Sequence, residues 1–405
     1  SLIQKRYPDV EEIIPLTPLQ EGILFHCNRY PETTAYQIQA GFTLEGELER
    51  EILKQAIAYL VQNHSSLHSA IYESEWSGAY QIVCKDKNVP ITYMDYRHLK
   101  DEEKEKHLAE FLEQNRLLKF ELDKGPLIRA ACIQREEKEY QFILTFHHIA
   151  MDGWSISIFM SELQEYYKRL LAGAGKEYVC KGQKEKKCGQ FKDYSRLLQT
   201  RDYVTDKKYW KQLLSEYDGN SIIHSISNIS EERNLKQKAA STTFNKERTA
   251  LIHTVLASCH LTMSNLMEGA WGILLKQYNN VDDVLFAKMV SGREVPLEDI
   301  DRIIGMFVNT VPVRLQLSND ESMLSIMQKI QKQSNASSEY SACSLPDVMQ
   351  DAGLEADMLR TLVVYENYPD ALNAGEQPFT YKRDFVDEET SYDITVCAGG
   401  YEGEL

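Results

Sequence analysis

Apolar residues recur at three- and four-residue spacings along several stretches of the chain, which is the pattern of amphipathic helices. Residues 50–62 show this spacing clearly, and residues 101–120 add acidic residues at the start, where the helix dipole favours negative charge. We expect a third long helix from about Ser155, directly after a turn at Asp152 and Gly153. The same spacing predicts further helices near residues 205–216, 246–258, 264–278 and 321–338.

Short runs rich in β-branched and aromatic residues predict strands. The predicted strands are residues 126–135, 139–147, 283–290, 307–317, 361–366 and 392–398. Strands and helices alternate without a regular βαβ order. We therefore expect a mixed α/β, or α+β, fold.

The length of the chain predicts more than one hydrophobic core. Its 405 residues exceed what a single core usually holds, so we expect two lobes. The stretch from residue 172 to residue 189 is rich in Gly and Lys and lacks periodicity, which is typical of a junction. We place the N-terminal lobe at residues 1–178 and the C-terminal lobe at residues 179–405.

Composition and charge exclude several classes of function. The formal net charge of -16 argues against a nucleic-acid groove, which needs clustered Lys and Arg. No apolar run approaches the roughly 18 residues of a membrane span, and the first residues lack a signal-peptide core. The 8 cysteines contain no Cys-x-x-Cys pair, so neither a zinc site nor a disulfide framework is indicated. We expect a cytoplasmic protein with reduced thiols and no metal.

Two adjacent histidines close the predicted strand at residues 139–147, and Asp152 and Gly153 follow before a helix begins. A strand end on a rigid scaffold can present side chains to a cleft. Neighbouring strand residues point to opposite faces, so only one of His147 and His148 can face a given cavity. The other should lie inside the lobe.

The residue types at this corner suit proton transfer. An imidazole moves protons near neutral pH. Asp152 can accept hydrogen bonds from backbone amides at the helix start or neutralise a nearby cation, and Gly153 allows a sharp turn. The simpler alternative is a pair of satisfied core histidines beside a turn. Two histidines, an aspartate and a glycine at this spacing favour a reaction centre.

Residues 147–155 read HHIAMDGWS and resemble the His-His-x-x-x-Asp-Gly signature of non-ribosomal peptide synthetase condensation domains. Further blocks that resemble motifs of the same family, in the same order, are residues 15–26, 191–194, 291–314 and 361–369. The resemblance implies two chloramphenicol-acetyltransferase-like lobes that form a V-shaped pseudo-dimer with a tunnel between them.

The resemblance also implies an acyltransferase reaction. Condensation domains join an acyl or peptidyl thioester on an upstream carrier domain to the amine of an aminoacyl thioester on a downstream one. Both substrates travel on phosphopantetheine arms, and no cofactor is bound permanently. The implied partners are the two carrier domains and an adjacent adenylation domain, and the chain alone should be a monomer. Residues 15–26 resemble the subtype whose donor ends in a D-residue.

By the same resemblance His148 is the active-site histidine, which reaches the attacking amine or the tetrahedral intermediate. The backbone amide of Gly153 is expected to stabilise developing negative charge. Asp152 and His147 are expected to support the site structurally. Positioning of the amine alone can account for much of the acceleration, so the resemblance leaves the base and the orienting roles of His148 open.

One block departs from the family pattern. Where the family has Arg-His-x-x-Leu-Arg, this chain has Asn63 and His68 in place of both arginines. One of those arginines commonly pairs with the aspartate equivalent to Asp152. We expect His68 or else Arg293 to take the place of that arginine beside Asp152. A histidine holds a carboxylate more weakly than a guanidinium, which offers two parallel N–H donors. The chain also ends soon after residues 393–396, where relatives continue, so a truncated C-terminus is expected.

Several alternatives share parts of these motifs. An epimerisation domain has the same signature, but residues 306–313 and 154–155 favour condensation. His147 excludes a heterocyclising variant, which carries an aspartate there. A free acyltransferase that uses coenzyme A should lack residues 15–26 and 365–369. A non-catalytic recruitment platform of the same fold stays open, because the usual arginines are absent.

Overall fold

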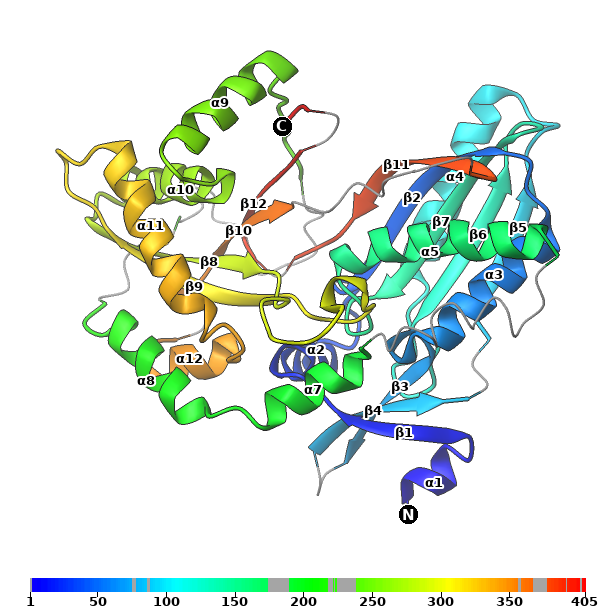
Figure 1. The fold of residues 1–405 in the computed structure, drawn as a ribbon, viewed down its shortest axis with the longest axis horizontal. Helices are drawn as coiled ribbons and strands as arrows, with labels where there is room; N and C mark the ends of the chain where they lie inside the picture. The colour runs from blue at the N-terminus through cyan, green and yellow to red at the C-terminus, as the bar shows by residue number, and fades with distance from the viewer. Residues whose placement is uncertain are drawn as a thin grey trace. The chain divides into compact units, whose positions relative to one another are not determined.

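The computed structural model describes residues 2–74, 78–85, 88–173, 189–217, 221, 223, 238–355, 358–366, 377–390, 392–400 and 403–405. The chain divides into two compact units (Figure 1). Unit 1 comprises Ser1–Arg201, Val295–Phe307 and Tyr368–Glu389, and unit 2 comprises Asp202–Glu294, Val308–Asn367 and Thr390–Leu405. Both units combine helices with sheets, which confirms the predicted mixed α/β class. The expected junction between residues 178 and 179 lies outside the described residues.

Unit 1 is built on a five-stranded sheet with the order β11-β2-β7-β6-β5. Its strands are β2 (Gln37–Gly46), β5 (Ile91–Asp95), β6 (Ile128–Gln134), β7 (Glu139–His147) and β11 (Phe379–Asp387). Strand β2 is antiparallel to both of its neighbours, so β7 and β11 run in the same direction. Their carboxyl ends therefore lie at the same end of the sheet.

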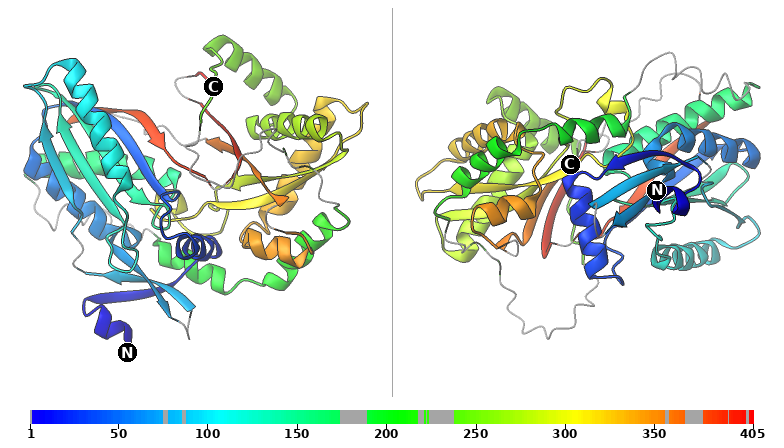
Figure 2. Two further views of the ribbon diagram at one scale, coloured as in Figure 1. Left: turned by 180° about the vertical axis from the view of Figure 1, so that it is seen from behind. Right: turned by 90° about the horizontal axis from the view of Figure 1, so that it is seen from below.

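A smaller sheet and several helices complete unit 1. The sheet has the order β1-β4-β3, with β1 (Val10–Pro15), β3 (Ser69–Ser74) and β4 (Gly78–Cys84). The helices are α1 (Leu2–Arg6), α2 (Pro18–Arg29), α3 (Arg50–Asn63), α4 (Asp101–Leu117), α5 (Gly153–Leu171) and α7 (Phe191–Gln199), with 3-10 turns η1 (Ser65–His68) and η2 (Ile300–Arg302). Helices α3 and α5 cover one face of the five-stranded sheet, and α4 covers the other (Figures 1 and 2).

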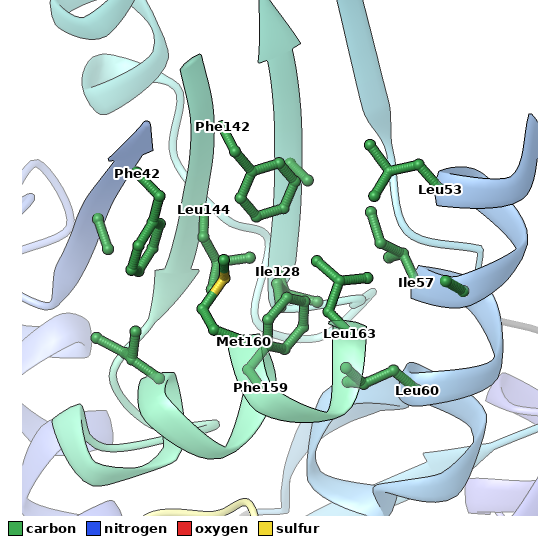
Figure 3. Close-up of a cluster of buried hydrophobic side chains, with 14 of the residues drawn as sticks. Phe42, Leu53, Ile57, Leu60, Ile128, Phe142, Leu144, Phe159, Met160 and Leu163 are labelled. Carbon is green, nitrogen blue, oxygen red and sulfur yellow. The ribbon is translucent and has the colours of Figure 1, made fainter. Parts of the chain in front are cut away.

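The two faces of this sheet differ in polarity because successive strand residues point to opposite sides. On the α3 and α5 side the buried side chains are apolar, and Figure 3 shows Phe42, Phe142, Leu144, Ile128, Leu53, Ile57, Leu60, Phe159, Met160 and Leu163 together. On the α4 side Gln39 and Thr145 are buried and reach Asn115 of α4, at 3.2 and 2.8 Å. This polar face fixes α4 and carries the odd-numbered residues of β7, among them His147.

Unit 2 contains a four-stranded sheet with the order β12-β10-β8-β9. The strands are β8 (Asp283–Val290), β9 (Asn309–Gln316), β10 (Thr361–Glu366) and β12 (Ile394–Gly399), and the helices are α8 (Tyr203–Leu214), α9 (Lys246–Ser258), α10 (Met263–Asn279), α11 (Met323–Ser338) and α12 (Leu345–Asp351). Val284 and Phe286 pack with residues of α10 and α11. Leu285 and Ala287 point the other way and pack with α8 and α12.

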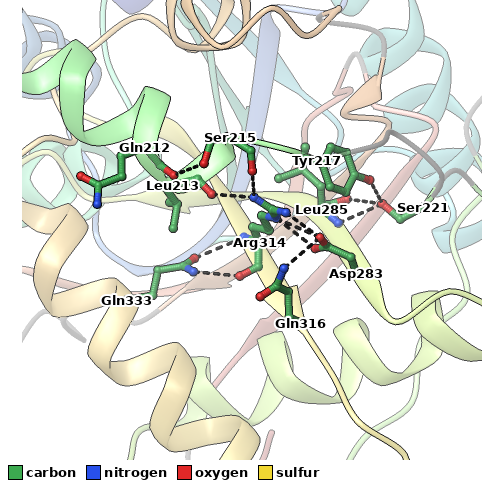
Figure 4. A network of polar contacts seen from close by, with 10 residues as sticks. All are labelled: Gln212, Leu213, Ser215, Tyr217, Ser221, Asp283, Leu285, Arg314, Gln316 and Gln333. Carbon is green, nitrogen blue, oxygen red and sulfur yellow. Dashed lines mark hydrogen bonds and ion pairs between the residues drawn. The ribbon is translucent and has the colours of Figure 1, made fainter.

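A polar network fastens α8 to the sheet of unit 2 (Figure 4). The guanidinium of Arg314 forms a forked ion pair with Asp283, with nitrogen–oxygen distances of 3.0 and 2.6 Å. Its remaining nitrogen donates to the carbonyl oxygens of Leu213 and Ser215 at the end of α8, at 3.0 and 2.5 Å. A forked charged pair of this kind fixes orientation as well as distance. These contacts therefore set the position of α8 on the sheet.

The strongly periodic elements predicted from the sequence are confirmed, and those with weaker patterns were missed. The predicted helices correspond to α3, α4, α5, α8, α9, α10 and α11, and the predicted strands to β6, β7, β8, β9, β10 and β12. Strand β11 had no predicted counterpart, although Phe379, Tyr381 and Phe385 alternate partly with polar residues. Among the elements that were not predicted, β11 matters most for the candidate site.

Membrane, metal and disulfide features are absent from the part of the chain that the structure describes. Each helix among these residues is too short or too polar to cross a lipid bilayer. Their His, Cys, Asp and Glu side chains form no group of three or more placed to hold a metal ion. The cysteines that the structure describes are free thiols, and Cys180 and Cys188 lie outside the described residues.

Candidate functional site

The candidate site lies at the carboxyl end of β7. The backbone N–H of His147 donates to Leu127 at 2.9 Å, and that of His148 donates to Tyr36 at 2.8 Å, so both neighbouring segments hold this strand end. Helix α5 begins at Gly153. Gly153 is thus the first helical residue, and the expected turn at Asp152 and Gly153 is wrong, because Asp152 already caps the helix.

His147 points into unit 1. Its side chain is buried, and its Nδ1 accepts a hydrogen bond from the backbone N–H of Ile149 at 3.2 Å. The ring proton therefore sits on Nε2, which lies 3.7 Å from Sγ of Cys27. Burial, with the charge of His148 adding, lowers the pKa of His147 to about 3. The ring is neutral at physiological pH, which suits the supporting role predicted for it.

The two ring nitrogens of His148 have different neighbours, one a backbone carbonyl and the other a carboxylate. Its Nδ1 lies 3.0 Å from the carbonyl oxygen of Met151, so Nδ1 carries a proton and donates it. Its Nε2 lies 3.3 Å from Oε1 of Glu388, the residue after β11. The side chains of His148 and Glu388 are 12% and 35% exposed. A lone pair on Nε2 would face a carboxylate, whereas an N–H is attracted to it, so the contact favours the imidazolium.

The pKa of His148 reflects this neighbour. Burial lowers the pKa, but the hydrogen bond and negative charge of Glu388, with the Met151 carbonyl and Asp152 adding, raise it to about 8. Burial raises the pKa of Glu388, and the contact with His148 more than reverses this, leaving it lowered. The stabilisation from this raised histidine pKa is fully present below the ordinary value near 6.5 and is lost as the pH rises through about 8.

Asp152 is fully buried and satisfied by neighbours in unit 1. Its Oδ1 accepts from the backbone N–H and the hydroxyl of Ser155, at 2.9 and 2.7 Å, which confirms the predicted helix cap. Its Oδ2 accepts from the backbone N–H of Phe307 at 3.1 Å, and its own N–H donates to Gly305 at 3.1 Å. The aspartate thus joins the start of α5 to a segment about 150 residues further along the chain.

Three more side chains hold the same segment. The hydroxyl of Ser155 lies 3.1 Å from the carbonyl oxygen of Gly305 and 3.2 Å from its nitrogen. Ser66 donates to Ile304 at 2.9 Å, and the indole of Trp154 donates to Asp301 at 3.2 Å. Neither serine was predicted as a site residue, because an isolated serine carries no pattern.

The positions where the family has arginines are used differently here. Asn63 donates to the hydroxyl of Tyr166 at 2.8 Å, and Nδ1 of His68 lies 2.7 Å from the carbonyl oxygen of Cys84. A role for His68 at Asp152 stays a prediction. Backbone amides and Ser155 supply donors to the Asp152 carboxylate. Arg293 is buried in unit 2, and a role for it at Asp152 stays a prediction.

Gly305 has no room for a side chain. A Cβ built there would lie 2.2 Å from Cδ2 of Phe191, whose ring meets that of Phe307 edge-on with centroids 5.3 Å apart. We expect Gly305→Ala to lower the free energy of unfolding by about 1–3 kcal/mol, and with it the thermal midpoint, because overpacking forces the ring or the segment to move. Differential scanning calorimetry measures the change.

Gly22 supplies the matched control for this substitution. It lies within α2, and a Cβ there would meet nothing within 4 Å. Gly22→Ala should leave the midpoint unchanged or raise it, since alanine favours a helix over glycine. Adding Phe191→Leu to Gly305→Ala should recover part of the loss. Equal midpoints for Gly305→Ala and wild type would contradict the close packing.

Glu388 is a further site residue that sequence reasoning missed. It is held by its flanking residues, since Arg116 at the end of α4 contacts Glu389 at 2.5 Å and Asp387 at 3.9 Å. Alternate residues of an extended chain point to opposite sides, so Glu388 points away from Arg116 and toward His148. Recognising β11 in the sequence would have placed Glu388 at the carboxyl end of a strand. It would not have shown that this strand pairs with β2, which is what brings Glu388 to the same end of the sheet as His148.

Comparison with known proteins identifies the family. The model of the condensation domain family matches residues 10–405. The chain belongs to this family. The matched residues therefore include all the motif blocks that were identified separately in the sequence.

Two curated relatives illustrate the relationship. Tyrocidine synthase 3 of Brevibacillus parabrevis is 29% identical over 395 residues, which is 97% of this chain and 6% of the relative. Bacitracin synthase 3 of Bacillus licheniformis is 29% identical over 396 residues, which is 96% of this chain and 6% of the relative. This condensation domain thus spans a small part of each synthase.

Solved structures show the same fold. The starter condensation domain of rhizomide synthetase has a TM-score of 0.77 at 16% identity, covering 96% of this chain and 85% of the other. The X-domain from teicoplanin biosynthesis has a TM-score of 0.75 at 19% identity, covering 96% and 86%. The first condensation domain of the calcium-dependent antibiotic synthetase has a TM-score of 0.74 at 18% identity, covering 96% of this chain and 87% of the other.

Proposed function

We propose that this condensation domain catalyses amide-bond formation in non-ribosomal peptide synthesis. An acyl or peptidyl thioester on an upstream carrier domain is the donor, and the amine of an aminoacyl thioester on a downstream carrier domain is the acceptor. Phosphopantetheine arms carry both substrates. The adjacent adenylation domain supplies the amino acid, and the whole synthetase works in the cytoplasm.

The observation that carries this proposal is the orientation of His148. The Met151 carbonyl fixes a proton on Nδ1, so Nε2 is the ring atom that can take a proton from an amine. The nitrogen sits at a strand end, where the sheet holds it through the backbone contact with Tyr36. Holding an amine beside such a nitrogen supplies both positioning and proton transfer, and each contributes to the rate.

Gly153 is proposed to stabilise the tetrahedral intermediate. Its N–H is the first of α5 and makes no hydrogen bond to any of the described residues. An amide at a helix start that is not used within the chain can donate to an oxyanion. Asp152 and His147 support this geometry by fixing the helix start and the strand end.

The donor subtype is proposed from the opening block, residues 15–26, which resembles that of domains accepting a D-residue. The test mixes the domain with two loaded carrier domains, one bearing the donor dipeptide and the other the acceptor amino acid. Mass spectrometry of the acceptor carrier should detect a tripeptidyl thioester, with a D-terminal donor converted faster than its L-epimer. Faster conversion of the L-epimer would reject the subtype, and no product from either donor would reject the proposed function.

A further inference from the structure

The pair formed by His148 and Glu388 presents a difficulty for the proposed reaction. In the imidazolium, Nδ1–H donates to the carbonyl oxygen of Met151 and Nε2–H donates to Glu388. His148 then has no lone pair that can accept a proton. The contact of 3.3 Å therefore represents a resting state in which the base is already protonated. Something must remove the influence of the carboxylate before the ring can act.

The other charges around His148 cannot do this. His147 is neutral and faces the interior of unit 1, and Asp152 is fully buried against Ser155 and Phe307. Glu389 is paired with Arg116 on the opposite side of the chain. Glu388 is the one carboxylate in contact with Nε2 among the described residues, and its side chain is 35% exposed. A ligand can therefore reach it.

The acceptor substrate carries a cation of matching chemistry. At neutral pH a large fraction of an α-amine is ammonium, which has the same charge as an imidazolium and offers N–H donors. A carboxylate that binds one of these cations can bind the other. Two cations sharing one carboxylate repel each other, so binding of the ammonium lowers the affinity of Nε2 for its proton.

We propose that Glu388 binds the α-ammonium group of the acceptor and, by this exchange, frees Nε2 of His148 to act as the base. This inference rests on the proposed function and names how that site recognises its nucleophile. Asp387 and Glu389, held by Arg116 on the other side of the segment, orient Glu388 for the task.

The protons balance in the following way. On binding of the ammonium, Nε2 releases its proton to water. The neutral ring then takes a proton from the ammonium and leaves a free amine. The amine nitrogen bonds to the thioester carbon, the carbon–sulfur bond breaks, and the sulfur leaves as a thiol with the second proton from nitrogen. The imidazolium is restored beside Glu388.

The raised pKa of His148 makes the exchange observable without turnover. The probe is glycine joined to pantetheine through an amide in place of the thioester, and its N-acetyl derivative lacks the positive charge. In the wild-type protein, saturation with the amine probe should lower the pKa of His148 in a histidine NMR titration, and the N-acetyl probe should not. His148→Ala identifies the signal by its loss.

Variants test the carboxylate directly. Glu388→Gln should weaken binding of the amine probe by about tenfold and leave the N-acetyl probe unchanged, since only the charged contact is lost. It should also lower the pKa of His148, because the hydrogen bond and negative charge of Glu388 that raise this pKa are lost while the effect of burial remains. Glu137→Gln removes an exposed carboxylate that contacts Arg97 and not His148, and it should bind both probes as wild type does.

The outcomes separate this inference from the proposed function. Equal binding of the amine probe by wild type and Glu388→Gln, or equal loss of both probes, would overturn the ammonium site. An unchanged pKa of His148 on saturation of the wild type would overturn the exchange. Discrimination between the probes by a wild type that forms no amide would instead reject the proposed function alone.

Discussion

His148→Ala should reduce the rate of amide formation by about 10²–10⁴-fold, which is the usual contribution of a positioned acid or base. The substitution removes the one ring nitrogen that can reach an amine at this strand end. Helix α5 and strand β7 keep their backbone contacts, because the N–H of residue 148 still donates to Tyr36. Single-turnover kinetics with loaded carrier domains measures the chemical step.

His98 provides a control for this result, since it is an exposed histidine outside the site. His98→Ala should form product at the wild-type rate, and calorimetry should show that both variants are folded. A His148→Ala protein as active as wild type would remove the catalytic assignment. The recruitment-platform alternative gains only if the wild-type protein also forms no product with substrates that a related domain joins.

Asp152→Asn should destabilise unit 1 by about 2–4 kcal/mol, although it changes few atoms. The amide offers one acceptor oxygen and one NH₂ donor in place of two acceptor oxygens. Since Ser155 and Phe307 both present backbone N–H groups to the carboxylate, one of them must then face a donor. A buried group that loses its partner costs more than an ordinary hydrogen bond contributes.

Hydrogen exchange locates this effect. The amide of Phe307 donates to Asp152, so its exchange in Asp152→Asn should be faster by about a hundredfold, in line with the loss of stability. Asp202 caps the exposed start of α8 through Val204, and Asp202→Asn should cost at most about 1 kcal/mol. Unchanged protection of Phe307 would show that the carboxylate does not hold the segment.

Local patterns predicted most of the regular structure of unit 2 and the three longest helices of unit 1, but only two of the strands of unit 1. The spacing of Leu53, Ile57 and Leu60 predicted α3, and those residues form part of the core. The histidine pair was also visible, because its order along a strand end is a local property. Asp152 as a helix cap followed from the same local chemistry.

Long-range partners could not be predicted in the same way. The backbone amide of Phe307 has no side-chain signature, so nothing in the sequence indicates that it satisfies Asp152. Glu388 comes close to His148 only because β11 and β7 both pair with β2. The contact of His68 with the carbonyl oxygen of Cys84 is of the same kind, because neither residue carries a pattern that indicates the pairing.

The discontinuous make-up of unit 1 has a consequence for biosynthesis and for engineering. The ribosome makes the histidines before Phe307 and Glu388, so an emerging fragment that ends at Arg201 has the histidines but lacks both of these partners. The reaction centre is therefore completed late, after most of unit 2 has been synthesised. A chimera that exchanges unit 1 between two synthetases must transfer three separate stretches of sequence, and a single crossover near residue 201 would pair the histidines of one parent with the carboxylate of the other.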